Sequence, residues 1–428
     1  MAQQPLQVAV LGAGTVGSQV IRLLSEQSAE FAARAGAPLE VASVVVRNLD
    51  APRDTPIARE LLTTDATSAI NSADLVVELI GGIEPARTFV LDALRQGTSV
   101  VTGNKALLAA HGPELYEAAA ASGADLYYEA AVAGAIPVVY GLRESLAGDQ
   151  ISQVLGIVNG TTNFILDAMT SQGLSYGDAL AIAQERGYAE ADPTADVEGL
   201  DAAAKCAILA SLAFHTRVGI DDVAVEGITA ITAEDIDEAS RSGQVVKLLA
   251  IAERGDNGIS VRVHPALVPQ DHPLASVDGA FNAVVVEGEA AGRLMFYGQG
   301  AGGAPTASAV LSDVVAAASH KVHGGNAPRE STYAKLPVLP ASDAVTSFQL
   351  RLRVEDRVGV LAEVASLIAA SGVSIQAVAQ SQPGPDGTCV LTLTTHPATE
   401  GSQQAVISAL RDSDAVREVL SAIRRVVA

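Results

Sequence analysis

The sequence predicts an α/β protein built from a parallel-sheet domain, an inserted mixed α/β domain and a small C-terminal α/β domain. Three observations support this fold class. Short apolar runs alternate with helical segments through residues 1–147, a pattern typical of a parallel sheet covered on both faces. From about Gly148, strand candidates are separated by long helical segments. Residues 324–346 contain three prolines and few regular patterns, which indicates a linker.

In the first domain we expect each strand to alternate with a helix. The strands are predicted at 7–11, 40–46, 75–80, 99–102 and 125–129, and the helices at 18–25, 85–96 and 113–122. A further helix, from Pro305 to about Ser319, has a proline suited to its first turn. We expect it to pack back against the first domain, so that residues 300–323 complete residues 1–147.

The two remaining domains show different patterns. The inserted domain, residues 148–299, is expected to bind substrate and to carry a subunit interface, with strands at 151–158, 259–267, 282–287 and 294–297. Residues 347–428 follow the order β-α-β-β-α-β, which predicts a ferredoxin-like fold. Its strands are expected at 348–354, 373–380, 388–394 and 416–427, and its helices at 361–370 and 402–412.

Composition narrows the possible partners. The 428-residue chain has a formal net charge of −22, which repels nucleic acid and anionic membranes. No basic leader is visible and no apolar run approaches membrane-spanning length, so we expect a cytoplasmic protein. Cys206 and Cys389 are too few for a disulfide framework or a thiolate metal site. We interpret Cys206 as a small buried hydrophobic residue.

A glycine turn joins the first predicted strand to the first helix. Gly12, Gly14 and Gly17 have the spacing and placement of a dinucleotide-binding turn, which makes the first domain Rossmann-type. The first glycine permits the turn, the second lets the backbone approach a pyrophosphate, and the third lets helix pack on strand. Thr15 and Val16, between the second and third glycines, are also predicted to contact the cofactor, and the N–H groups at the start of the following helix would face its phosphates.

The second predicted strand suggests which cofactor the turn binds. An NAD-preferring site usually carries Asp or Glu at the end of this strand. Here the strand is followed by Arg47, with Arg53 nearby, and a guanidinium can pair with a 2′-phosphate. We therefore predict NADP(H) in preference to NAD(H). The alternative is that Arg47 is an exposed arginine that contacts only solvent.

The segment from Gly187 to Lys205 gathers carboxylates and one ammonium in a charge-poor chain. Asp201 and Lys205 are four residues apart in an apolar predicted helix, residues 200–214, and therefore share a face. The chain has five Lys against twenty-two Arg, so a lysine here suggests a function that needs a titratable amine. Taken alone, the two residues could equally form an ordinary helix ion pair.

Seven segments together resemble homoserine dehydrogenases, and they occur in that family's order. They are 12–17, 78–82, 102–105, 128–137, 160–163, 187–205 and 300–309. The resemblance implies NAD(P)H-dependent, reversible reduction of L-aspartate 4-semialdehyde to L-homoserine, a step of threonine and methionine biosynthesis. No zinc-type cluster and no preceding kinase half are visible in the sequence.

The resemblance also implies roles for individual residues. Lys205 would be the catalytic acid and base. Asp201 would orient its amine and contact the substrate amino group, and Lys105 would contact both substrate and nicotinamide. Glu190 and Asp196 would be further carboxylates around the zwitterionic substrate. Besides the glycine turn, cofactor contacts would come from Gly82, Thr102, Gly103, Lys105, Gly187, Gly302 and Gly303.

A monovalent cation, sodium or potassium, is also implied by the resemblance. Its ligands would be the side chain of Glu129 and the backbone carbonyls of Val132, Gly134 and Ile136. From the residues alone, this segment would be interpreted as a turn after a strand.

Residues 347–428 resemble an ACT regulatory domain, through Asp356–Leu361 and Gly372–Ile375. Such domains commonly pair and bind small amino acids, and the implied pathway suggests L-threonine as an inhibitor of a homodimer or homotetramer. The alternative is a purely structural dimerisation domain. Two other functions are compatible with parts of the sequence, namely another semialdehyde or hydroxy-acid dehydrogenase and an inactive cofactor-binding sensor. The presence of both Lys105 and Lys205 disfavours the sensor.

Overall fold

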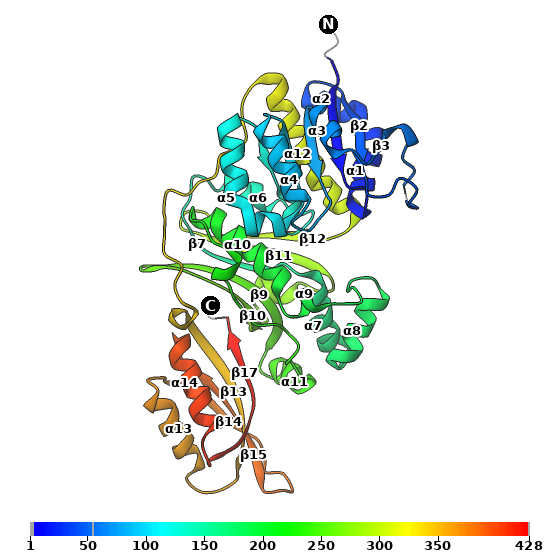
Figure 1. The fold of residues 1–428 in the computed structure, drawn as a ribbon. Helices are drawn as coiled ribbons and strands as arrows, with labels where there is room; N and C mark the ends of the chain where they lie inside the picture. Colours follow the sequence, from blue (N-terminus) through cyan, green and yellow to red (C-terminus); the bar gives the residue numbers. More distant parts are fainter. Residues whose placement is uncertain (1–3, 54, 427–428) are drawn as a thin grey trace. The chain divides into compact units, whose positions relative to one another are not determined.

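The computed structural model describes residues 4–53 and 55–426 (Figure 1). The chain forms two compact units, and each is described by itself. The first comprises the chain up to Gly160 together with residues 201–223 and 280–336. The second comprises residues 161–200, 224–279 and the chain from Pro337 onwards.

The first unit contains a six-stranded sheet in the order β3-β2-β1-β4-β5-β6, and all of its pairings are parallel. Its strands are β1 (Leu6–Leu11), β2 (Leu39–Val45), β3 (Leu62–Thr63), β4 (Leu75–Glu78), β5 (Ser99–Thr102) and β6 (Leu126–Tyr127). The flanking helices are α1 (Thr15–Glu26), α2 (Ser28–Ala35), α3 (Ala66–Asn71), α4 (Ala86–Arg95) and α5 (Lys105–Ser122). The predicted parallel α/β fold is confirmed.

Helix α12 (Gly303–His323) returns to this sheet (Figure 1). It packs on α1 and on β4 and β5, and its buried Val310 and Val314 join Val8 and Val10 in one core cluster. The predicted return of this helix is confirmed. Helix α5 begins at Lys105, earlier than the predicted 113–122, because the Asn104 side chain accepts the Leu107 N–H and caps it.

The strands β7 (Ile151–Ile157), β11 (Phe281–Gly288) and β12 (Gly292–Gln299) pair antiparallel in the first unit. The apolar helix α10 (Leu200–Phe214) lies almost entirely within this unit and is buried along most of its length. A short helix α6 (Val138–Tyr140) runs directly into a π-helical turn, Gly141–Ser145. Short 3₁₀ turns occur in both units. Those of the first unit are Arg59–Leu61, Glu129–Ala131 and Ile220–Asp222, and those of the second are Pro273–Ser276 and Ala341–Asp343.

The second unit contains an antiparallel pair of long strands and four helices. The strands are β9 (Gln244–Gly255) and β10 (Gly258–Pro269), and the two-residue strand β8 (Ala224–Val225) pairs with β10. The helices are α7 (Gly160–Gln172), α8 (Tyr176–Glu185), α9 (Thr194–Val197) and α11 (Ala233–Arg241). Strand β9 was not predicted from the sequence, because its apolar residues do not alternate.

The C-terminal β-α-β-β-α-β order is confirmed. The strands are β13 (Val345–Glu355), β14 (Ile375–Gln380), β15 (Thr388–Thr395), the short β16 (Ala398–Thr399) and β17 (Val416–Arg425). The helices α13 (Val360–Ala370) and α14 (Glu400–Arg411) enclose a separate apolar core with Phe348, Leu352 and Leu393. Strand β17 also pairs in parallel with β10 through Ala266 and Leu267. Among the described residues, no helix has the length and apolar character needed to span a membrane.

Candidate active site

The glycine turn has the geometry that a dinucleotide requires. Gly12 has φ +102°, and a Cβ there would lie 2.7 Å from the Leu79 carbonyl oxygen. A Cβ on Gly17 would meet the Gly12 oxygen at 2.1 Å, so helix α1 could not pack this closely on β1. Gly14 has open space where a side chain would be. The first and third glycines therefore serve the fold, and the second leaves the backbone accessible to a ligand.

Two helix N-termini meet at this turn. Neither α1 nor α12 has a side-chain cap on its first N–H groups. A Cβ on Gly303 would lie 3.0 Å from the Thr15 carbonyl oxygen, which shows how closely the two ends approach. Gly302, at φ +125°, turns the chain into α12. Unpaired helix N–H groups attract anions, so the donors present fit the pyrophosphate of a dinucleotide.

A buried network shapes the neighbouring edge of the sheet. The fully buried Glu78 accepts the Thr102 hydroxyl at 2.6 Å and the Ile80 N–H at 2.8 Å. Asn104 in turn donates to the Gly82 carbonyl at 2.7 Å. This fixes the loops that follow β4 and β5 beside the point where the strand order reverses, where open α/β sheets bind ligands. Because Thr102 uses its hydroxyl internally, it would contact a cofactor through its backbone.

The two arginines predicted to set the cofactor preference differ in the contacts that their side chains make. Arg47 follows β2 and is exposed. Arg53 uses its guanidinium to hold its own loop, donating to the carbonyls of Asn48 at 2.7 Å and Ala51 at 2.9 Å. Arg47 is therefore the freer of the two to pair with a phosphate.

Lys205, Asp201 and Lys105 come together in the first unit. One Asp201 carboxylate oxygen pairs with the Lys205 ammonium at 2.8 Å, and the other pairs with the Lys105 ammonium at 2.6 Å. The Lys205 and Asp201 side chains are 11% and 8% exposed, whereas that of Lys105 is 43% exposed. Two ammonium groups share one carboxylate, so an excess positive charge remains for an anionic group of a ligand.

The environment of Lys205 leaves one of its donors available. Its Nζ donates to the Val158 carbonyl at 2.6 Å and to Asp201 at 2.8 Å. An ammonium has three N–H groups, and among the described residues no acceptor takes the third. Burial alone would raise the pKa of Asp201, but the charges of Lys205 and Lys105 outweigh it and hold that pKa far below its usual range. Asp201 therefore stays ionised and keeps Lys205 oriented.

Three predicted residues belong to the second unit. Gly187 has φ +73° in the loop after α8, Glu190 is exposed in the same loop, and Asp196 lies in α9. The loop is held at its base, because the Thr161 hydroxyl donates to the Tyr188 carbonyl at 2.6 Å. The roles of Gly187, Glu190 and Asp196 stay predictions.

The segment proposed to hold a cation has an irregular backbone. Ala133 adopts φ +57° although it is not glycine, and Gly134 follows at φ +58°. No donor within residues 4–53 and 55–426 reaches the carbonyl oxygens of Val132 or Gly134. The Glu129 carboxylate accepts the N–H groups of Val139 at 2.9 Å and Tyr140 at 2.8 Å. Strained backbone with unpaired carbonyls beside a buried carboxylate fits a hard cation.

Sequence reasoning missed part of the lysine site. Asn159, which is 5% exposed, donates its Nδ2 to Asp201 at 2.9 Å, and Val158 supplies the carbonyl bonded by Lys205. Both follow β7, far from α10 in the sequence. The available signal was the Asn-Gly pair that ends an apolar strand and begins α7.

The fold and the site define a class of protein: a nicotinamide-dependent oxidoreductase with a lysine-containing catalytic domain and a ferredoxin-like C-terminal domain. Family models agree with this description. The homoserine dehydrogenase NAD-binding domain matches residues 12–129, the homoserine dehydrogenase domain matches 137–315, and the ACT domain matches 348–426. The chain belongs to the homoserine dehydrogenase family and is an oxidoreductase that acts on a CH–OH group.

Curated relatives and a solved structure match over nearly the whole chain, and a second solved structure matches about three quarters of it. The homoserine dehydrogenase of Corynebacterium glutamicum is 57% identical, with 97% of this chain and 95% of that one covered. That of Mycobacterium tuberculosis is 53% identical, with 99% and 98% covered. The crystal structure of a homoserine dehydrogenase from Thiobacillus denitrificans superposes with a TM-score of 0.93 at 41% identity, covering 99% of both chains. A hyperthermophilic archaeal homoserine dehydrogenase in complex with NADPH has a TM-score of 0.62 at 27% identity, covering 73% and 98%.

Proposed function

We propose that this protein reduces L-aspartate 4-semialdehyde to L-homoserine, reversibly and with NADPH, in threonine and methionine biosynthesis. The observation that carries the proposal is the third N–H of Lys205, in a site with one positive charge in excess. An aldehyde oxygen can accept that N–H, and the excess charge suits the carboxylate of an amino-acid substrate.

The proposed reaction uses two ammonium groups in different ways. The nicotinamide cofactor, when bound, supplies the hydride. Lys205 donates a proton to the aldehyde oxygen, which becomes the hydroxyl of homoserine, and Asp201 keeps the ammonium in place. Lys105, which is more exposed, would bind the substrate carboxylate and would also contact the nicotinamide. Glu190 and Asp196 would hold the substrate ammonium. In the oxidative direction, Lys205 would accept the hydroxyl proton. Because oxidation of the alcohol releases a proton, we expect alkaline pH to favour that direction.

Cofactor preference would come from Arg47. An exposed guanidinium after the second strand, in place of an acidic residue, supports pairing with a 2′-phosphate. The NADPH named with the archaeal relative agrees with this preference. Arg53 would contribute indirectly, by shaping the loop that follows Arg47.

A monovalent cation, sodium or potassium, would be held by Glu129 and the carbonyls of Val132, Gly134 and Ile136. The support is the strained backbone at Ala133 and the two unpaired carbonyls. The cation would neutralise the buried carboxylate and fix the loop. A Cβ on Gly134 would lie 2.5 Å from the Gly300 oxygen, so the same loop also packs closely against the segment that leads into α12.

The ACT domain would pair with a second copy and bind L-threonine as a feedback inhibitor. Strand β14 lies at the edge of its sheet and is largely exposed, with Val378 43% exposed. The turn before α13 presents a fully exposed Val358. An open edge beside exposed apolar side chains supports a homodimer or homotetramer built partly through this domain.

The direct test follows NADPH oxidation at 340 nm in full-length protein with L-aspartate 4-semialdehyde, with and without L-threonine. We expect semialdehyde-dependent turnover with NADPH, slower turnover with NADH, and inhibition by threonine. Substrate-independent NADPH loss, or activity only with an unrelated hydroxy acid, would refute the proposed reaction. Unchanged turnover in threonine would refute only the proposed effector.

A further inference from the structure

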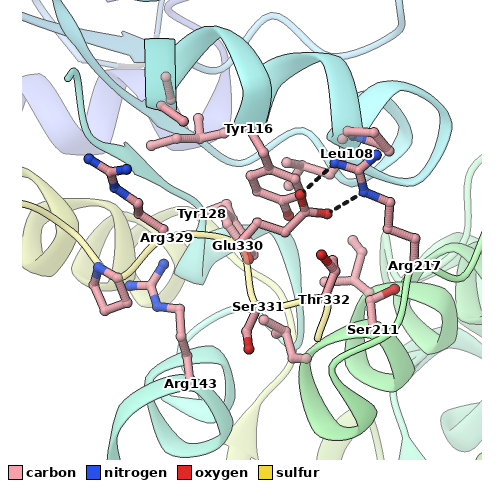
Figure 2. A pocket seen from close by; sticks show the side chains of 18 of the residues that line it. Leu108, Tyr116, Tyr128, Arg143, Ser211, Arg217, Arg329, Glu330, Ser331 and Thr332 are labelled. Carbon is pink, nitrogen blue, oxygen red and sulfur yellow. Dashed lines mark hydrogen bonds and ion pairs between the residues drawn. The ribbon is translucent and has the colours of Figure 1, made fainter. Parts of the chain in front are cut away.

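A cavity of about 630 Å³ lies in the first unit, bounded by α5, the C-terminal half of α10 and the chain at residues 326–333 (Figure 2). Its volume is in the range of small-molecule sites. The residues that line it do not include Lys105, Asp201 or Lys205. It is therefore separate from the site described above.

Carboxylates are in excess on one side of the cavity. Glu330 takes two hydrogen bonds from Arg217, at 2.9 and 2.7 Å, and Glu117 shares the same guanidinium at 3.2 Å. Two carboxylates with one arginine leave a negative charge uncompensated. The Asp125 carboxylate is already engaged, by His320 at 2.8 Å and by the Ala327 N–H.

Guanidinium groups are in excess on the other side. Figure 2 shows Arg143 and Arg329 on the side of Glu330 opposite Arg217, with the guanidinium of Arg329 directed away from Glu330. Arg329 is exposed, and no ion-pair partner for it lies among the described residues. Arg143 is only 8% exposed; it pairs with the surface residue Glu144 at 3.1 Å, and its Nε–H is buried without an acceptor.

Arg143 is held rigidly in this position. Its guanidinium lies over the rings of Tyr127, Tyr128 and Tyr140, at 5.1, 5.7 and 5.4 Å from their centroids. Burial raises the pKa of Tyr116 and Tyr128, so both hydroxyls stay protonated, and they hydrogen-bond to each other. A rigid cation beside neutral donors is preorganised for a carboxylate.

The remaining walls are apolar or irregular. Leu108, Ile208 and Leu212 line the helical side. The wall at 326–333 has neither helix nor strand, and its Tyr333, 76% exposed, stacks on His215 with ring centroids 4.7 Å apart. An irregular wall can yield to a ligand more readily than packed helices.

We propose that this cavity is a binding site for a small α-amino acid, separate from the catalytic site and from the ACT domain. The ligand's carboxylate faces Arg143, and the exposed side chain of Arg329 turns in from the rim to join it. The ligand's ammonium faces Glu330 and Glu117, and its side chain rests on the apolar faces of α5 and α10. Opposite charge excesses on facing walls select a zwitterion over a simple acid or a simple amine. Lys105 begins α5 and Lys205 lies on α10, so occupancy is expected to alter turnover.

The test uses the absence of tryptophan from the chain. A Tyr333→Trp variant of the full-length protein places a single tryptophan at the mouth of the cavity. Each proteinogenic amino acid is titrated in turn while emission is recorded. We expect a saturable change with at least one of them. In the Tyr333→Trp background, Glu330→Gln and Arg329→Gln should each weaken that affinity about tenfold or more, because each removes a charge-assisted contact.

Two controls separate this site from others. A Tyr297→Trp variant carries its tryptophan on β12, outside the cavity lining, and should not respond. The des-amino analogue of the active ligand should bind at least tenfold more weakly. Glu330→Gln and Arg329→Gln should retain NADPH oxidation without added amino acid, which shows intact folding. The proposal is overturned by no response from any amino acid, by affinity unchanged in both variants, or by equal binding of the des-amino acid. The readout is binding, so failure would leave the proposed reaction untouched.

Discussion

Lys105 and Asp201 form an ion pair at 2.6 Å that joins the first residue of α5 to the first turn of α10. The pair fixes one helix against the other at the place where Lys205 also binds Asp201. Asp201 thus orients a buried ammonium and an exposed one with a single carboxylate. Removing each of the three charges in turn should have its own effect, so single substitutions can test the role of each residue.

The first prediction concerns the proposed proton donor. Lys205→Ala should lower turnover by about 10²–10⁴, the range associated with general acid–base catalysis. NADPH binding should be nearly unchanged, because the glycine turn and the ends of α1 and α12 do not involve Lys205. Stopped-flow turnover and NADPH fluorescence titration measure the two quantities. Lys105→Ala is the comparison, and it should raise KM more than it lowers kcat. Near-normal turnover in Lys205→Ala would exclude it as the proton donor.

The second prediction concerns Asp201. Asp201→Asn leaves two ammonium groups without a counter-charge and should destabilise the first unit by roughly 3 kcal/mol, somewhat reduced by the exposure of Lys105. The pKa of Asp201 is depressed in the folded protein, so its stabilisation is complete above the unfolded-state pKa, near 4, and is lost as pH falls below it. Denaturant unfolding should therefore show a wild-type advantage that is constant from pH 5 to 7 and shrinks toward pH 3. A constant difference at all these pH values would contradict the assignment.

The lysine site shows how far a sequence can predict geometry. Asp201 and Lys205 could be paired from helical spacing alone, because residues four apart on a helix share a face. Lys105 could be placed at the end of a parallel strand, where such sheets bind ligands. Asn159 and the Val158 carbonyl could not be found this way, since their contact with α10 depends on tertiary packing. No local pattern encodes that contact.

In the fold, too, some elements could be predicted from local sequence patterns and others could not. Strands of the parallel sheet were predicted because buried β-branched runs are bounded by glycine turns. Strand β9 was missed because Val245, Val246, Leu248 and Leu249 repeat as a helix would, and its partner β10 decides the outcome. Arg53 was predicted from proximity to Arg47, but its donors are used by its own loop. Side-chain use of this kind depends on backbone geometry that composition does not specify.

The third prediction concerns cofactor choice. Arg47→Ala should weaken NADPH binding by about tenfold or more, because a charge-assisted contact with the 2′-phosphate is lost. NADH binding should be unchanged. Comparing kcat/KM for the two cofactors measures the preference directly. Arg59→Ala is a matched control, since that exposed arginine of the same region pairs with Asp50 and the Leu49 carbonyl. An equal loss with NADPH and NADH would show that Arg47 acts on the fold and does not recognise the phosphate.

The last prediction concerns the proposed cation. Burial raises the pKa of Glu129 to about 7 and that of Asp313, whose side chain accepts the Glu129 N–H, to about 8. Both values lie above those of the unfolded chain, so stability is lost as pH rises from about 4 towards them. A bound cation offsets this cost and competes with the proton, and its affinity should rise up to about tenfold per pH unit until pH 7.

Sodium or potassium should therefore raise Tm more at pH 8 than at pH 5, relative to choline at equal ionic strength. In Glu129→Gln the amide does not titrate, so the increment should be small and similar at both pH values. Differential scanning calorimetry of both proteins in the three salts measures this. Equal increments with choline, or a wild-type increment independent of pH, would argue that Glu129 does not bind the cation.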